Sequence, residues 1–282
     1  MRSIIFTLLL FTGYFAFSQI NTPRVSPATK VEQMVGLTEL KLEYSRPSMR
    51  GREIFGNLVP FNKIWRTGAD NSTKISFSTD VVIAGQIVNS GTYSVFSIPN
   101  QKEWDVILYS DTEIWGVPRD WSEEKIVFSS KFSVNQIGKA VETFTVSFNK
   151  LTNNDVSLNI SWENTSVDIK IEVPTKSMVE KDIQKVLNNN PKASDFYAAA
   201  VFYRQENIML DKALEWMNKA IEMTESPKFW QYRQQSLIMA ANNKYKNAVE
   251  AAKKSLELAT KADNQDYVKM NKESISEWSK KF

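Results

Sequence analysis

The spacing of apolar residues changes once along this chain, near Pro174. Before that point apolar and polar side chains alternate with period two, as in strands that bury one face. After it, apolar residues recur at helical spacing, as in Leu214, Met217 and Ile221. Glycine follows the same division, because all nine glycines precede Pro174. The sequence therefore predicts a β-rich domain over 19–173, followed by an α-helical domain over 174–282.

The β-rich part is read as a series of short strands separated by turn residues. Val81–Ile83 and Gln86–Val88 flank Ala84-Gly85, which is a hairpin signal. Asn164-Thr165 is read as a second turn. Further strands are expected at 31–35, 40–44, 75–77, 93–98, 104–108, 144–148, 156–162 and 167–173. Many short strands of this kind are typical of an antiparallel β-sandwich or jelly-roll-like domain.

The helical part contains an internal repeat. Helices are expected at about 193–206, 210–223, 227–241, 244–259 and 263–280. A shift of 35 residues aligns Ala213 with Ala248 and Ile221 with Leu256. This pattern resembles tetratricopeptide repeats, whose period is ~34 residues. The match is degenerate, because Val201 stands where that family has a glycine. The resemblance implies a short repeat domain with a surface for a protein partner.

The amino terminus has the features of a secretory signal peptide. A basic start at Arg2 precedes an apolar run from Ile4 to Phe17, and small residues occupy positions 16 and 18. The run is shorter than the ~20 residues of a membrane span, which is the alternative reading. We expect residues 1–18 to be removed near Ser18/Gln19. The remaining chain is then extracytoplasmic, in the periplasm or secreted, with no transmembrane anchor.

Composition excludes several kinds of chemistry. The chain has no histidine and no cysteine, which excludes serine–histidine triads, cysteine nucleophiles and the usual zinc sites. No cofactor and no metal are therefore expected. The 35 basic residues nearly balance the 32 acidic ones, so no concentrated basic face for nucleic acid is predicted.

The segment from Tyr44 to Asp70 is unusually rich in arginine. Arginine forks bind carboxylate or phosphate groups in a bidentate manner, so this segment is a candidate for an anion-binding site. The alternative is that the arginines pair with Glu43, Glu53 and Asp70 and hold a long loop against the sheet. The candidate ligand-binding residues here are Arg46, Arg50, Arg52, Arg66 and Asp70.

Tryptophans and carboxylates supply two further hypotheses. Trp115 and Trp121 flank a short loop and, with Trp104 and Trp162, are candidates for stacking against a sugar ring; the alternative is that these rings fill the core. Pairs of Asp or Glu side chains are candidates for glycosidase-type acid–base catalysis. That chemistry depends on a spatial separation of the carboxylates that the sequence does not specify.

Four stretches occur in order: EYSRPSMRGREIFG, LVPFNKIWRTGAD, ISFSTDV and GTYSVFSIP. Together they resemble the bacterial family called domain of unknown function 2911, over about Ser26 to Val173. The resemblance supports the domain assignment and supplies no activity, substrate or catalytic residue.

The function expected from these features is that of an exported, non-catalytic binding or scaffolding protein of the bacterial cell envelope. Its β domain would bind a small anionic or glycan ligand, and its helices would dock to that domain or bind a protein partner. The alternative is a carboxylate-dependent hydrolase that acts on envelope glycan.

Overall fold

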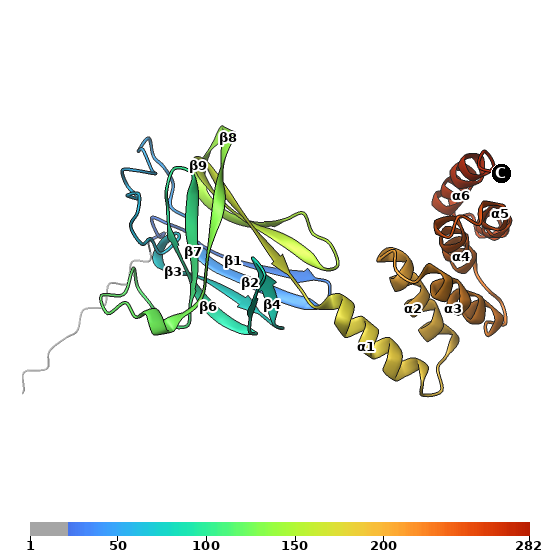
Figure 1. Cartoon of the computed structure of the whole chain (residues 1–282). Helices are drawn as coiled ribbons and strands as arrows, with labels where there is room; N and C mark the ends of the chain where they lie inside the picture. The colour runs from blue at the N-terminus through green and yellow to red at the C-terminus, as the bar shows by residue number, and fades with distance from the viewer. Residues whose placement is uncertain (1–21) are drawn as a thin grey trace, which may run out of the picture. The chain divides into compact units, whose positions relative to one another are not determined.

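The computed structural model describes residues 22–282 (Figure 1). The expected signal peptide, residues 1–18, lies outside the described residues. The chain divides into two compact units after Thr175. Within residues 22–282, no helix is both long enough and apolar enough to cross a membrane.

The first unit is an open antiparallel sheet, which has nine strands within the described residues. The spatial order is β1-β2-β3-β6-β7-β8-β9-β4-β5. The strands are β1 Ala28–Val35, β2 Thr38–Ser45, β3 Ala69–Phe77, β4 Val81–Ile83, β5 Gln86–Val88, β6 Gly91–Ile98, β7 Glu103–Tyr109, β8 Ile126–Asn149 and β9 Asp155–Glu172. The expected order of a β domain followed by helices is confirmed, and β4 and β5 form the expected hairpin.

Strand β2 has one buried face and one polar face, as its alternation predicts, whereas β6 and β7 are buried on both faces. In β2, Leu40 and Leu42 are fully buried, while Lys41 between them lies on the opposite face. A slip of one residue in the pairing would expose both leucines, so burial fixes the register. Leu42 lies between Val31 of β1 and Ile75 of β3.

The sheet bends so that its distant strands enclose one core. In the strand order β2 and β8 are separated by three strands, yet Tyr44 of β2 contacts Phe144 of β8 with ring centroids 5.9 Å apart. The Tyr44 hydroxyl donates to the carbonyl of Val146 at 2.9 Å and accepts from the amide of the same residue at 3.0 Å. Ring contacts and side-chain hydrogen bonds of this kind between the two sides of the bend give the domain a sandwich-like interior.

The long strands β8 and β9 continue through irregular positions. Their pairing shifts between Gln136 and Val141 and again before Thr145. Opposite this region Glu163 has φ 54°, in the left-handed region. The turn predicted at Asn164-Thr165 is therefore wrong, because β9 runs through it as a bulged strand.

The second unit is helical, with six helices in the described part of the chain. They are α1 Thr175–Leu187, α2 Ala193–Gln205, α3 Leu210–Glu222, α4 Phe229–Ala241, α5 Tyr245–Lys261 and α6 Gln265–Trp278. Small side chains allow close packing, because Ala213, Ala220 and Ala248 are completely buried. One apolar cluster joins α1, α2, α3 and α4, and a second joins α4, α5 and α6. Helix α1 was not predicted.

Candidate functional site

Most of the arginine-rich segment serves to fix the backbone. Arg46 donates from Nε to the carbonyl of Phe144 at 3.1 Å and from Nη2 to the hydroxyl of Thr145 at 2.8 Å. These bonds attach the end of β2 to β8. Arg46 is thereby occupied as a tether between strands.

Arg50 and Arg52 also satisfy nearby backbone groups. Arg52 donates to the carbonyls of Met49 at 2.8 Å and Ser48 at 2.7 Å, which closes a tight turn. The Arg50 side chain donates to the carbonyl of Val25 at 3.3 Å. Within residues 22–282, neither forms an ion pair, and Glu43 pairs with Lys30 instead. The alternative in which arginines pair with Glu43, Glu53 and Asp70 is not observed here, although the loop is held in place.

Arg66, Asp70 and Trp115 lie in one neighbourhood. The carbonyl of Asp70 accepts from the amide of Gly116 at 3.2 Å. A β-carbon added at Gly116 would lie 3.6 Å from Nη1 of Arg66. The Nε atom of Arg66 is buried and has no hydrogen-bond partner among the described residues. Three of the predicted site residues are thus brought together by the approach of the 110–121 segment to the start of β3.

Trp115 and Trp121 have different surroundings. Trp115 is 71% exposed. Trp121 stacks on Tyr109, with ring centroids 4.5 Å apart, and its indole donates to Glu123 at 3.0 Å. Trp121 thus packs against a small apolar cluster on the outer face of the sheet, formed by Phe96, Ile107, Tyr109 and Ile114. Of this pair, only Trp115 offers an open ring face to a ligand.

A polar pocket lies on the outer face of β1, β2 and β3. Its cavity measures about 300 Å³. Three of its side chains are basic, namely Arg24, Lys30 and Lys74, and one is acidic, Glu43. The remaining lining residues are Ala28, Thr29, Tyr44, Ser45, Asn71 and Ser72. Asn71 forms an isolated backbone bridge with Trp115, so the exposed indole belongs to a residue that adjoins the pocket. We call this pocket, together with Trp115, the outer-face site.

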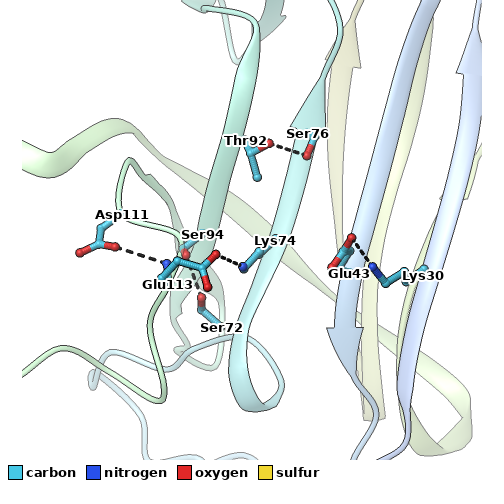
Figure 2. A network of polar contacts seen from close by, with 9 residues as sticks. All are labelled: Lys30, Glu43, Ser72, Lys74, Ser76, Thr92, Ser94, Asp111 and Glu113. Atoms are coloured by element: carbon cyan, nitrogen blue, oxygen red, sulfur yellow. Dashed lines mark hydrogen bonds and ion pairs between the residues drawn. The ribbon is translucent and has the colours of Figure 1, made fainter.

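Charges alternate across the outer-face site (Figure 2). Lys30 of β1 pairs with Glu43 of β2 at 2.8 Å, and Lys74 of β3 pairs with Glu113 at 2.7 Å. The strand register sets this row, because Glu43 is the pairing partner of both Lys30 and Lys74. The Lys74 side chain is only 20% exposed, so its ammonium group is held in a defined place.

Pairs of hydrogen-bonded hydroxyl groups stiffen the sheet beside the row formed by Lys30, Glu43 and Lys74. The hydroxyls of Ser72 and Ser94 are 2.7 Å apart, and those of Ser76 and Thr92 are 2.8 Å apart. Both pairs link β3 to β6, and Figure 2 shows them next to Lys74. The neighbouring loop is held by Asp111, whose carboxylate bonds Lys125 at 3.3 Å. That hydrogen bond raises the pKa of Lys125.

The model of one protein family matches residues 26–171, which cover the sheet. Its description is protein of unknown function (DUF2911). The chain belongs to this family. No curated protein and no solved structure matched the chain. The outer-face site therefore lies within the DUF2911 domain, and its chemistry has to be argued from its own residues.

The carboxylates of the DUF2911 domain do not gather into a metal site. Among residues 22–282, no three Asp or Glu side chains cluster so as to hold a metal ion. Glu43 and Glu113 each bond a lysine, and Lys74 lies beside both. The arrangement is suited to binding an anion beside the lysines.

Several residues of the outer-face site are not predicted by the sequence analysis. Lys30 and Lys74 occupy polar positions of ordinary alternating stretches, which are also typical of a solvated strand face, and Arg24 lies in the irregular segment before β1. The signal that could have found them is the in-register row of Lys30, Glu43 and Lys74. Reading that row requires the strand order β1-β2-β3, which periodicity does not provide.

Proposed function

We propose that this chain is an exported, non-catalytic binding protein of the cell envelope whose DUF2911 domain binds a small anionic saccharide. The observation that carries the proposal is the outer-face site. It combines a cavity of about 300 Å³, three basic lining side chains and a neighbouring Trp115 that is 71% exposed. Small-molecule sites are typically ~300–1,000 Å³, so the cavity suits one or two sugar rings.

The charge of the site supports an anionic ligand. Lys30 and Lys74 already have carboxylate partners, but Arg24 has no ion-pair partner within residues 22–282. A ligand carboxylate could bond Arg24 and share Lys74 with Glu113, whose side chain is 84% exposed and free to move. The sheet stiffened by the hydroxyl pairs reduces the ordering that binding requires.

The exposed indole supports a saccharide. Tryptophan combines a large apolar face with one hydrogen-bond donor, and such side chains are enriched where binding energy is concentrated. A pyranose ring likewise has an apolar face and a polar rim. Trp115 would cover that apolar face while the basic side chains bind the carboxylate.

The helical unit is proposed to consist of two tetratricopeptide-like repeats, α2–α3 and α4–α5, with α6 as a cap. Helices α3 and α5 begin 35 residues apart, at 210 and 245, and α2 and α4 begin 36 apart, at 193 and 229. Equivalent caps open α2 and α4, since the amide of Lys192 donates to Asp195 at 2.8 Å and that of Lys228 donates to Gln231 at 2.9 Å. Stacked helix pairs present a surface to proteins, so this unit is the proposed partner-binding part.

The envelope location is proposed from the pattern of residues 1–18 alone. Mass spectrometry of the protein from fractionated cells checks it. We expect a mature amino terminus near Gln19 in an extracytoplasmic fraction. An intact Met1 in the cytoplasmic fraction would contradict export.

The hydrolase alternative receives no support from the outer-face site. Glu43 and Glu113 both contact lysine ammonium groups, and of the two only Glu43 lines the cavity. We therefore keep the proposal of a non-catalytic role.

Calorimetric titration of the full chain with glucuronate tests the binding proposal, and titration with glucose gives the salt dependence of a sugar without a carboxylate. We expect glucuronate binding that weakens as salt is added, since exposed charges are screened. Trp115→Ala should weaken it at least about tenfold, as for a central aromatic contact. The matched control is Trp230→Ala, a partly exposed tryptophan of the helical unit, which should leave the affinity unchanged. Equal glucuronate affinity in Trp115→Ala, or no heat from glucuronate, would contradict the proposal.

A further inference from the structure

A second cavity lies on the inner side of the DUF2911 domain, beneath the segment that joins β2 to β3. Its volume is about 180 Å³. It is lined by the aromatic rings of Phe55, Phe61 and Trp104 and by Val134. The polar lining residues are Asn100, Gln101, Gln136, Glu163, Asn164 and Thr165. We call it the inner cavity.

Trp104, one of the residues that line the inner cavity, has an unsatisfied buried donor. Trp104 is 0% exposed, and its indole N–H has no hydrogen-bond partner among the described residues. Two other tryptophans of the same core differ in this respect. Trp65 donates to the carbonyl of Gly68 at 3.1 Å, and Trp162 donates to that of Glu142 at 3.1 Å. Leaving a buried donor unpaired costs about 1–3 kcal/mol. An acceptor from a bound ligand would remove this cost at the Trp104 N–H.

The aromatic wall is built by specific contacts. Phe55 packs on Trp104 with ring centroids 5.0 Å apart. Phe61 lies so close to Gly56, which has φ 96°, that any side chain at position 56 would collide with its ring at 2.8 Å. The carboxylate of Glu163 accepts from the amides of Ile54 at 3.3 Å and Phe55 at 3.4 Å. The left-handed backbone at Glu163 and the glycine at 56 both serve to bring this segment against the cavity.

The rim is polar and uncharged apart from Glu163. Within residues 22–282, the side-chain amides of Gln101, Gln136 and Asn164 make no hydrogen bond to the protein. These amides both donate and accept, which suits hydroxyl groups. No lysine or arginine is among the described lining residues, and Glu163 disfavours an anion. The inner cavity is therefore complementary to a neutral ligand with one apolar face and several hydroxyls.

From this geometry we infer that the inner cavity is a binding site for a single neutral sugar ring, distinct from the outer-face site. The apolar ring face packs on Phe61, the amide rim bonds the hydroxyls, and a small movement of the buried Trp104 ring brings its indole N–H to one ring hydroxyl. One water alone would leave most of the volume empty, since a water occupies about 30 Å³. A drug-sized ligand is too large, because such sites span ~300–1,000 Å³.

The first test uses N-acetylglucosamine and glucose as probes of the full chain. Saturation-transfer NMR should detect both sugars, and the Trp104 indole N–H resonance, assigned by its absence in Trp104→Phe, should shift as either sugar is added. Phe61→Ala and Gln136→Ala should each weaken binding about tenfold, as for loss of one packed ring face or a pair of hydrogen bonds. Gln136 is exposed on the rim, so its removal leaves the fold intact.

Two controls keep this inference separate from the proposed function. Gln205→Ala, an exposed glutamine in the helical unit, should leave sugar binding unchanged. Trp115→Ala should leave the affinity for the neutral sugars unchanged although it weakens glucuronate binding. The inference is overturned if neither sugar gives saturation transfer, if the Trp104 resonance stays fixed, or if Trp115→Ala removes the neutral sugars. The first two outcomes would assign the cavity to water only.

Discussion

The two units of this chain are stabilised in opposite ways. The sheet depends on contacts between residues far apart in sequence, such as the bond between Tyr44 and Val146, which are 102 positions apart. The helices depend on neighbours, because from α2 onward each helix packs mainly on the one before or after it along the chain. Large aromatic rings fill the core of the sheet, whereas small alanine side chains allow the helices to pack closely in the core of the helical unit. A single substitution should therefore disturb the whole sheet, whereas in the helices its effect should stay close to its site.

The largest expected effect comes from Trp162→Ala in the sheet. Trp162 is 1% exposed, and its ring contacts Phe144 at 5.7 Å and Trp65 at 6.1 Å. Removing a buried tryptophan costs about 3–5 kcal/mol of the free energy of unfolding. Urea unfolding should show the sheet transition move to low denaturant while the helical transition stays in place. Trp230→Ala, the partly exposed control, should change stability by less than about 0.5 kcal/mol. A shift of both transitions by Trp162→Ala would show that the units do not unfold separately.

An intermediate effect is expected from Ala213→Leu in the helical unit. Ala213 is 0% exposed, so a larger side chain has no room and should cost about 1–3 kcal/mol. Far-UV circular dichroism during urea unfolding should report a lower helical transition and an unchanged sheet transition. Ala198→Leu, at an exposed position of α2, is the matched control and should be nearly neutral. Equal losses from both variants would argue against close packing at Ala213.

The smallest effect is a dependence on pH. Burial, reinforced by the carboxylate of Glu180, raises the pKa of Tyr203 above its ordinary value of 10.0. The neutral hydroxyl is favoured in the folded state, so its contribution is complete below pH 10 and is lost as pH rises through the folded-state pKa. The melting temperature of the helical unit should fall between about pH 8 and about pH 11 more in wild type than in Tyr203→Phe.

Tyr93 provides the matching case in the sheet, because burial also raises its pKa. Tyr93→Phe should reduce the alkaline loss of the sheet transition only. A parallel alkaline loss in wild type and both variants would rule out these two hydroxyls as its source.

The sequence was sufficient for most elements and insufficient for their arrangement. Alternation located the strands at 40–44 and 104–108 because every second residue of each faces the main core, and helical spacing located α2 to α6. At Glu163 the left-handed backbone interrupts the alternation without a glycine, so the pattern was read as a turn where β9 continues. Helix α1 was missed for a different reason. Its sequence is polar on average and resembles a linker until its apolar residues pack on α2 and α3.

The candidate sites were harder to predict than the fold. Arg46, Arg50 and Arg52 are residues of the type that binds anions, but each donates to a backbone carbonyl instead. The sequence does not show which carbonyls lie near them, because that depends on the fold. Lys30 and Lys74 lie 44 positions apart and meet on either side of Glu43 through the strand order. The inner cavity depends on Phe61 and Gln136, which no local pattern connects.

The pairing of β4 with β9 also governs when the sheet can form during synthesis. Val82 pairs with Glu172, so the β4–β5 hairpin leaves the ribosome 90 residues before its partner strand does. At ~5–20 residues per second this interval lasts several seconds. During that time the hairpin and the inner faces of β1 to β7 remain uncovered, and such long-range pairing is slow to complete. The sheet is therefore complete only after its last strand has emerged.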